Sequence, residues 1–156
     1  LMEQLEELVL QIPGSAQMLT IPGVGFITVA GFLSEVGDLQ RYEHSRQIQK
    51  LAGLSLKENS SGKRKGRTRI TKRGRPRLRA LLFRCALPLV AKNPEFKALH
   101  AYFTKRANNP LHRKQSLIAL CCKLIRILFV LGRKQIPYDA AKLQGALHQV
   151  QLQEVA

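Results

Sequence analysis

A cationic stretch in the middle of the chain sets the strongest constraint on the fold. Between residues 57 and 74 only Ile70 is a candidate for a hydrophobic core, and ten of the seventeen residues from Lys63 to Arg79 are Lys or Arg. Ten like charges this close together repel one another, and they are useful together only when an anion binds them. A disordered basic tail has a similar composition, but this stretch lies between two apolar regions. We therefore expect a basic loop that can hold a short strand at 67–71.

The apolar regions on either side of the loop predict helices. Apolar residues follow three-four spacing from Pro76 to Val90, and a further helix is expected over 94–106. Segment 111–133 would carry apolar residues around most of the circumference of a helix, which predicts a central buried helix that ends at Gly132. No long strand is evident, so the predicted class is all-α. Shorter helices are expected over 15–20 and 44–54.

The N-terminal residues carry a narrow apolar stripe. Leu1, Leu5 and Leu8 are spaced four and three residues apart, as in a coiled coil. Because the chain starts with Leu1 inside this pattern, we expect a piece cut from a longer protein. The predicted organisation is a coiled-coil stub over 1–13, a helical domain over 14–137 and a loosely ordered tail over 138–156.

A glycine-rich turn precedes the expected helix 26–36. The segment Ile21-Pro22-Gly23-Val24-Gly25 resembles the hairpin of a helix-hairpin-helix motif. Glycines at Gly23 and Gly25 permit positive φ and let the backbone approach a phosphate, which the N-terminus of the next helix attracts. A plain packing turn has the same residues, so both readings stay open.

Charge and composition narrow the class of protein. A net charge of +16 in 156 residues indicates a polyanionic partner, most commonly a nucleic acid, although acidic substrates and anionic membranes fit the same charge. The longest apolar stretch is interrupted by Lys123 and Arg126, which argues against a membrane span. Three cysteines, two of them adjacent, form neither a disulfide framework nor a zinc site, and they indicate a reducing interior. They are Cys85, Cys121 and Cys122.

Few residues in the chain have catalytic potential. The carboxylates are scattered and the histidines unpaired, so the residues suggest no magnesium or zinc site. Ser60 and Ser61 stand at the head of the cationic loop. A hydroxyl among cations can attack a phosphodiester, because the cations stabilise the developing charge. Ser-Ser-Gly is equally typical of a flexible loop.

Several of these segments, taken in order, carry a resemblance to a known family. The chain resembles the C-terminal transposase domain of the insertion-sequence 110/116/902 type transposases, relatives of the Piv and MooV DNA invertases. The resemblance covers roughly residues 1–135. Its motifs are Leu19-Thr20-Ile21-Pro22-Gly23-Val24-Gly25, Leu51-Ala52-Gly53-Leu54, Ser61-Gly62, Ile70-Thr71-Lys72-Arg73-Gly74 and Leu78-Arg79.

The resemblance implies a serine recombinase built from two parts. An N-terminal RuvC-like domain carries acidic residues that hold Mg²⁺, and the C-terminal domain supplies a serine nucleophile. Ser61, immediately before Gly62, matches the nucleophile position, and Ser60 is the second choice. We expect no cofactor in this chain, Mg²⁺ in the missing acidic domain, and no activity from the chain alone. The family also implies DNA as a partner, a structured bridge RNA in some members, homo-oligomers, and a cytoplasmic, nucleoid-associated protein in bacteria or archaea.

Three hypotheses for the function remain open at this point. The first is a recombinase domain with a serine nucleophile. The second is a non-catalytic helix-hairpin-helix module that binds nucleic acid, and the third is an RNA-binding structural protein of ribosomal type. The third rests on the same basic stretch. For the first hypothesis, the expected nucleic-acid contacts are Gly23, Gly25, Lys63, Arg64, Lys65, Arg67, Arg69, Lys72, Arg73, Arg77 and Arg79.

Overall fold

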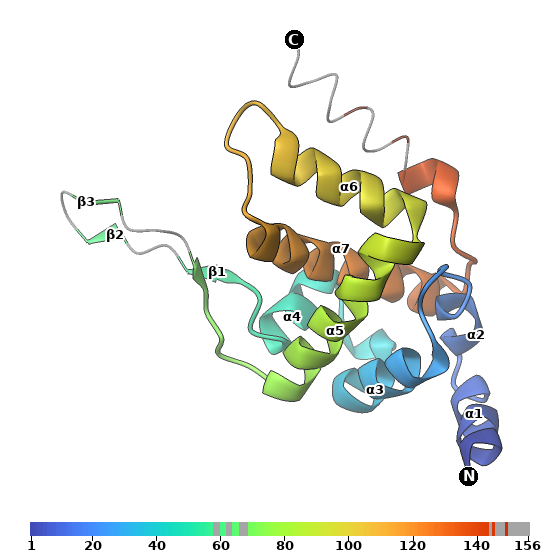
Figure 1. Ribbon diagram of the computed structural model, residues 1–156. Coiled ribbons are helices and arrows are strands. Elements are labelled where there is room, and N and C mark those ends of the chain that lie inside the picture. The colour runs from blue at the N-terminus through green and yellow to red at the C-terminus, as the bar shows by residue number, and fades with distance from the viewer. Residues whose placement is uncertain (58–59, 62–63, 66–68, 144, 146–148, 150–156) are drawn as a thin grey trace.

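Helices make up most of the described part of the chain (Figure 1). The computed structural model describes residues 1–57, 60–61, 64–65, 69–143, 145 and 149. The predicted all-α class is confirmed, since the strands are only two residues long. In chain order the elements are α1 (Met2–Leu10), α2 (Ser15–Met18), α3 (Phe26–Val36), the 3-10 helix η1 (Leu39–Arg41), α4 (Ser45–Leu51), β1 (Leu56–Lys57), β2 (Ser60–Ser61), β3 (Arg64–Lys65), β4 (Arg69–Ile70), α5 (Pro76–Lys92), α6 (Pro94–Lys105) and α7 (Arg113–Lys134).

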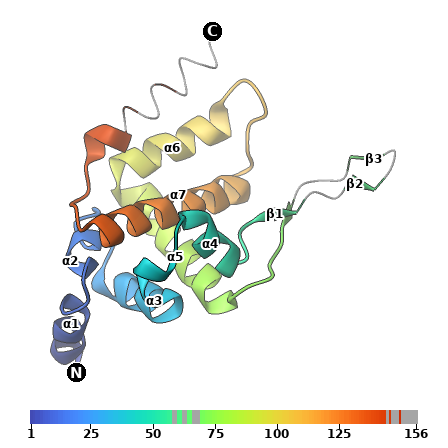
Figure 2. The same ribbon diagram turned by 180° about the vertical axis from the view of Figure 1, so that it is seen from behind.

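Helix α7 lies at the centre of the fold, as its apolar girth predicts. Helices α2, α4, α5 and α6 all pack against it (Figures 1 and 2). The Gln115 side chain accepts a hydrogen bond from the His112 backbone N–H at 2.9 Å and so fixes the first turn. The buried residues of α7 are Ser116, Leu117, Leu120, Cys121, Leu124, Ile125, Leu128, Phe129, Leu131 and Gly132.

The expectation that Gly132 closes this helix is wrong. The helix continues to Lys134, and Gln135 caps it in a left-handed conformation with φ of 53°. Gly132 serves packing instead, because a Cβ there would lie 2.5 Å from the Leu39 side chain, and a Cβ on Gly14 would lie 2.6 Å from the Gly132 Cα. The glycine allows α2 to approach the core helix closely.

Helices α3 and α5 pack side by side in opposite directions. In the middle of the contact, a Cβ on Gly31 would lie 2.9 Å from Leu81 Cδ2. At one end, the turn before α3 meets the last turns of α5, where a Cβ on Gly23 would lie 3.0 Å from Leu89 Cδ2. Asn93 fastens this end, since its Nδ2 donates to the Pro22 carbonyl at 2.9 Å.

The basic segment between α4 and α5 forms a narrow ribbon. Strand β1 pairs antiparallel with β4, and β2 pairs antiparallel with β3. Both views show the β2–β3 end of this ribbon extending away from the helices (Figures 1 and 2). The loop expectation therefore needs correction to a two-stranded ribbon, while the strand expected within 67–71 is present at Arg69–Ile70.

Helix α1 leaves the domain at the opposite edge. Val9 is its buried residue, so the helix contacts the domain through Val9 rather than through its leucine stripe. Leu5 and Leu8 are 43% and 60% exposed. The stripe expected for a coiled coil is thus uncovered in this chain.

Residues 138–143 pack back onto the domain. The Tyr138 N–H donates to Thr20 Oγ1 at 2.9 Å, and its hydroxyl donates to Glu95 Oε1 at 3.2 Å. Leu143 is buried. The boundary expected at residue 137 and the loosely ordered tail stay predictions.

Candidate nucleic-acid interface

The base of the basic ribbon is clamped to the end of α4 by backbone hydrogen bonds. The Lys72 N–H donates to the Gly53 carbonyl at 3.0 Å, and the Arg75 N–H donates to the Leu51 carbonyl at 2.8 Å. Gly53 adopts φ of +72° and Lys72 adopts φ of +54°, so both legs turn sharply where they meet. The chain thus leaves the helical body and returns to it at one point.

Glycine is required at this clamp on both legs. A Cβ on Gly74 would collide with the Leu51 carbonyl oxygen and lie 2.6 Å from the Gly53 nitrogen. A Cβ on Gly53 would lie 2.7 Å from Arg79 Nη1 and 3.0 Å from the Lys72 carbonyl carbon. These two glycines belong to the quoted family motifs, and the structure shows a close backbone approach as the physical reason for them.

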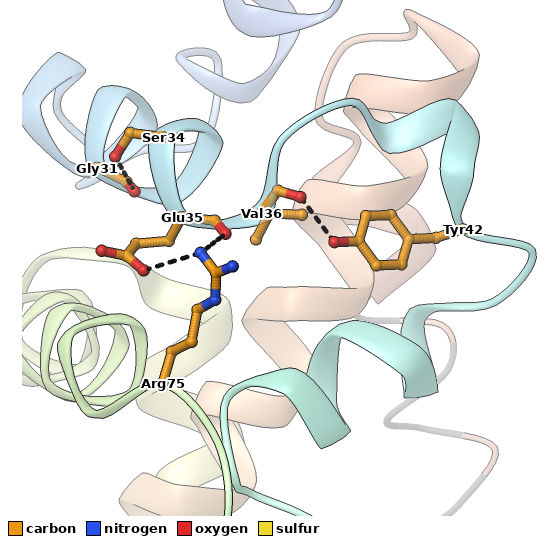
Figure 3. A network of polar contacts seen from close by, with 6 residues as sticks. All are labelled: Gly31, Ser34, Glu35, Val36, Tyr42 and Arg75. Atoms are coloured by element: carbon orange, nitrogen blue, oxygen red, sulfur yellow. Dashed lines mark hydrogen bonds and ion pairs between the residues drawn. The ribbon is translucent and has the colours of Figure 1, made fainter.

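Arg75 joins the returning leg to the C-terminal end of α3 (Figure 3). Its Nη1 donates to the Glu35 carbonyl at 2.8 Å and lies 3.5 Å from the Glu35 carboxylate. This is the only ion pair among the residues that the structure describes. On the other side of the same helix end, the Tyr42 hydroxyl donates to the Val36 carbonyl at 2.6 Å (Figure 3). Arg75 therefore positions the ribbon. This structural role agrees with the sequence analysis, which did not include Arg75 among the predicted phosphate contacts.

Arg79 also has a structural contact that the sequence did not reveal. Its Nη1 donates to the Ala52 carbonyl at 3.2 Å and so caps the end of α4 from outside. A guanidinium has five N–H donors in all, so Arg79 retains donors for an anion.

The structure divides the predicted site residues of the basic segment into three groups. Lys63 and Arg67 lie outside the described residues, and Ser60, Ser61, Arg64 and Lys65 are placed by their strands alone. In the β2–β3 ladder Ser61 is the register partner of Arg64, and Ser60 is the partner of Lys65. The predicted nucleophile is therefore next to two predicted phosphate contacts at the outer end of the ribbon. The third group comprises the exposed cations Arg69, Lys72, Arg73 and Arg77, with the half-buried Arg79, around the ribbon base.

A groove lies where the ribbon base meets the first turns of α5 and α7. It has a volume of about 560 Å³, and its apolar lining residues include Phe83 and Ile118. Four cations line it, and none of its described lining residues is acidic. We call this the basic groove, and its cations are Lys72, Arg79, Arg84 and Lys114. Sequence reasoning missed Arg84 and Lys114, which are thirty positions apart and meet only in the fold.

The glycine turn lies away from the ribbon. Gly23 contacts α5 at Leu89, whereas the ribbon returns to α5 at Arg75, which is fourteen residues or about 20 Å earlier along the helix. Gly23 has φ of +95°, and Gly25 is the exposed N-cap of α3 with no side-chain cap. The first N–H groups of α3 are therefore open to an anion. The structure does not bring this turn and the ribbon together.

Two of the histidines and the three cysteines have structural surroundings. His44 Nδ1 accepts from the Arg46 N–H at 3.0 Å, and His100 Nδ1 lies 2.8 Å from Ser116 Oγ. Burial raises the pKa of the Cys121 thiol to about 12, and neighbouring Cys122 and Cys85 add to the effect. Burial also raises the pKa values of Cys85 and Cys122. A neutral thiol is a poor nucleophile.

The described residues do not form a magnesium site. They include no group of three or more His, Cys, Asp or Glu side chains placed to hold a metal ion.

Helix α7 is long and apolar enough to cross a membrane by length and composition, but 61% of its most apolar stretch is buried inside the domain. A mostly buried core helix passes the same test.

Comparison with known proteins places the chain in a family of transposases. The family described as "Transposase IS116/IS110/IS902 family" matches residues 15–101, which is more than half of the chain. The chain therefore belongs to this family, as the ordered motifs predict. The matched region includes the glycine turn, the ribbon and all of α5.

Individual relatives agree with the family assignment. The chain is 33% identical over 124 residues to the transposase for insertion sequence element IS1111A of Coxiella burnetii, covering 76% of this chain and 33% of that protein. It is 31% identical over 140 residues to the transposase for IS1328 of Yersinia enterocolitica, covering 83% of this chain and 41% of that protein. It is 26% identical over 123 residues to the pilin gene-inverting protein of Moraxella bovis, covering 78% of this chain and 38% of that protein. The chain thus spans about a third to two fifths of these relatives.

Proposed function

We propose that this chain is the domain of a DNA transposase that binds DNA and supplies the serine for strand cleavage and exchange. The observation that carries the proposal is the position of Ser61 in β2, at the outer end of a cationic ribbon and in register with Arg64. Family membership supports a role in DNA rearrangement, because the relatives include transposases and a pilin gene-inverting protein.

The proposed reaction is a transesterification. The Ser61 hydroxyl oxygen attacks a DNA phosphorus, the bond from phosphorus to one deoxyribose oxygen breaks, and that oxygen takes up a proton as the serine loses one. Cations of the ribbon stabilise the charge that develops on the phosphate. Attack by a deoxyribose hydroxyl of another strand end then restores a phosphodiester and frees the serine, so the exchange needs no ATP.

The chain's own residues complete only part of such a site. A serine hydroxyl is a weak nucleophile and needs a proton acceptor. The described histidines His44 and His100 are engaged elsewhere, and the described carboxylates do not gather into a metal site. We therefore place the acceptor and the Mg²⁺ in another part of the longer protein, and we expect the chain alone to bind DNA without cutting it. The exposed Leu5 and Leu8 of α1 suit a coiled coil that joins copies in a homo-oligomer.

Salt-dependent binding tests the nucleic-acid part of the proposal. If about six cations meet phosphates, a plot of log K against log salt has a slope near −5 on duplex DNA. Replacing Arg64 and Lys65 by Ala should make the slope shallower by about 2, whereas Lys97→Ala with Lys105→Ala should leave it unchanged. Lys97 and Lys105 are exposed residues of α6 and belong neither to the ribbon, nor to the basic groove, nor to the glycine turn. A wild-type slope shallower than about −2 would contradict the proposal.

The helix-hairpin-helix interpretation remains a second candidate for DNA contact. It is favoured by the exposed, uncapped N-terminus of α3 behind Gly25. In this reading the turn contacts a phosphate about 20 Å from the ribbon, so one DNA duplex can touch both. A non-catalytic module that binds nucleic acid would have the same geometry. The two functions differ in whether the serine becomes covalently linked to DNA. A guide RNA on the same cationic surface would give similar binding to DNA and RNA.

A further inference from the structure

The basic groove combines features that a DNA duplex does not use. Cations line it together with apolar residues that include the half-buried Phe83 and Ile118, which we call its apolar floor. A duplex presents phosphates and sugars to a protein surface and keeps its bases stacked inside, so it would leave an apolar floor uncovered. An unpaired nucleotide offers both a phosphate for the cations and a flat apolar base for the floor.

We infer that the basic groove holds an unpaired nucleotide of a DNA strand, with its phosphates on Arg84 and Lys114 and its base against Phe83. This inference rests on the proposed function, because strand exchange requires that paired strands open near the cut. A volume of about 560 Å³ is within the range of pockets that hold small organic groups.

The cations of the groove keep donors for the phosphates. Arg84 Nε donates to the Ala80 carbonyl at 3.3 Å, which holds the side chain along α5 and leaves its terminal N–H groups for a ligand. Lys114 is the second residue of α7 and is exposed, so its ammonium group and the positive end of the helix dipole act in the same direction. Lys72 and Arg79 bring the ribbon base to the same groove.

The position of the groove links it to the proposed reaction. The ribbon that carries Ser61 begins at the clamp where Lys72 meets Gly53, and Lys72 also lines the groove. A strand that follows the ribbon cations toward the helices therefore arrives at the groove. We expect a base displaced near the cleavage point to be held there while the strands are exchanged.

Binding of single-stranded and duplex oligonucleotides by fluorescence anisotropy tests the inference. The groove variant is Arg84→Ala with Lys114→Ala, and the control variant Lys97→Ala with Lys105→Ala removes the same charge elsewhere. We expect the groove variant to weaken single-strand binding about tenfold or more and to make its salt slope shallower by about 1.4. Duplex binding should change no more than in the control variant.

A second arm tests the base contact. A strand of the same length whose sugars carry no bases should bind the wild-type protein about fivefold or more weakly than the normal strand. Phe83→Leu keeps an apolar side chain and should remove most of that difference. If Phe83→Leu does not fold, the comparison of the two strands on the wild-type protein still decides whether bases contribute.

Three results would overturn the inference. The first is that the groove variant binds both probes as its control does. The second is that it weakens single-strand and duplex binding equally. The third is that the strand without bases binds the wild-type protein as well as the normal strand. Any of these with intact wild-type DNA binding refutes the groove site alone. If the wild-type protein binds neither probe, the proposed function fails as well.

Discussion

The backbone at Gly74 lies so close to the Leu51 carbonyl that no side chain fits between them. A Cβ at Gly74 would also lie 2.6 Å from the Gly53 nitrogen, and neither atom belongs to a flexible side chain. The clamp at the ribbon base therefore depends on a glycine at this position. This contact sets the direction in which the ribbon leaves the helices.

Gly74→Ala should accordingly destabilise the fold by about 1–3 kcal/mol, because backbone must move to admit the methyl group. In a chain of this length the melting temperature should fall by several degrees. Gly25→Ala is the matched control, since nothing lies within 4 Å of its added Cβ and its φ is −93°. Thermal unfolding followed by circular dichroism measures both, and equal melting temperatures would contradict the clamp.

Gly25→Ala serves a second test, because it should leave the fold intact. If the first N–H groups of α3 bind a phosphate, the added methyl group stands where the DNA backbone approaches. We expect duplex affinity to fall about threefold to tenfold, on the order of the net value of one ordinary hydrogen bond, about 0.5–1.5 kcal/mol. Unchanged affinity in the folded variant would leave the turn with a packing role only.

The buried cysteine cluster makes stability depend on alkaline pH. The Cys121 thiol has a folded pKa of about 12 against 9.0 for an ordinary thiol. Between these values the unfolded chain loses a proton that the folded chain keeps, so stability falls as pH rises from about 9 toward 12 and is unaffected below that window. Urea unfolding at several pH values measures this decline.

Cys121→Ala should flatten the alkaline part of that curve. The variant also loses some packing, because Cys121 is 1% exposed, so its stability is lower at every pH. The comparison therefore concerns slopes and not absolute values. Equal slopes in the two proteins above pH 9 would show that the thiol does not titrate with folding.

Periodic apolar spacing was enough to predict the helical part of the fold. Helices α5, α6 and α7 begin and end within about two residues of the expected segments, because each has a continuous apolar face. The predicted end of α7 at Gly132 was wrong, because the sequence alone does not distinguish a glycine that allows a neighbouring helix to approach from one that ends a helix. Packing against Leu39 and Gly14 distinguishes the two.

The candidate site was predictable in composition but not in arrangement. The cationic stretch and Ser61 stand out in the sequence, whereas strands of two residues are too short to show an alternating pattern. Arg84 and Lys114 were missed because their helices meet only in the folded domain. The separation of Gly25 from the ribbon likewise depends on how α3 packs along α5.

The proposal that this chain contributes to a serine recombinase depends on the identity of the nucleophilic serine. Ser61 and Ser60 are neighbours on β2, and their register partners are Arg64 and Lys65. Each substitution replaces one hydroxyl by hydrogen and leaves the rest of the side chain unchanged, so the pair provides its own matched control. DNA binding should remain near wild type in both variants.

The most direct measurement is the covalent adduct between the full-length protein and DNA. A suicide substrate that traps the cleaved strand is incubated with wild type, Ser61→Ala and Ser60→Ala, and protein-linked DNA is detected on a denaturing gel. We predict an adduct with wild type and with Ser60→Ala, and none with Ser61→Ala despite normal DNA binding. An adduct of undiminished yield with Ser61→Ala would contradict the assignment of Ser61 as the nucleophile.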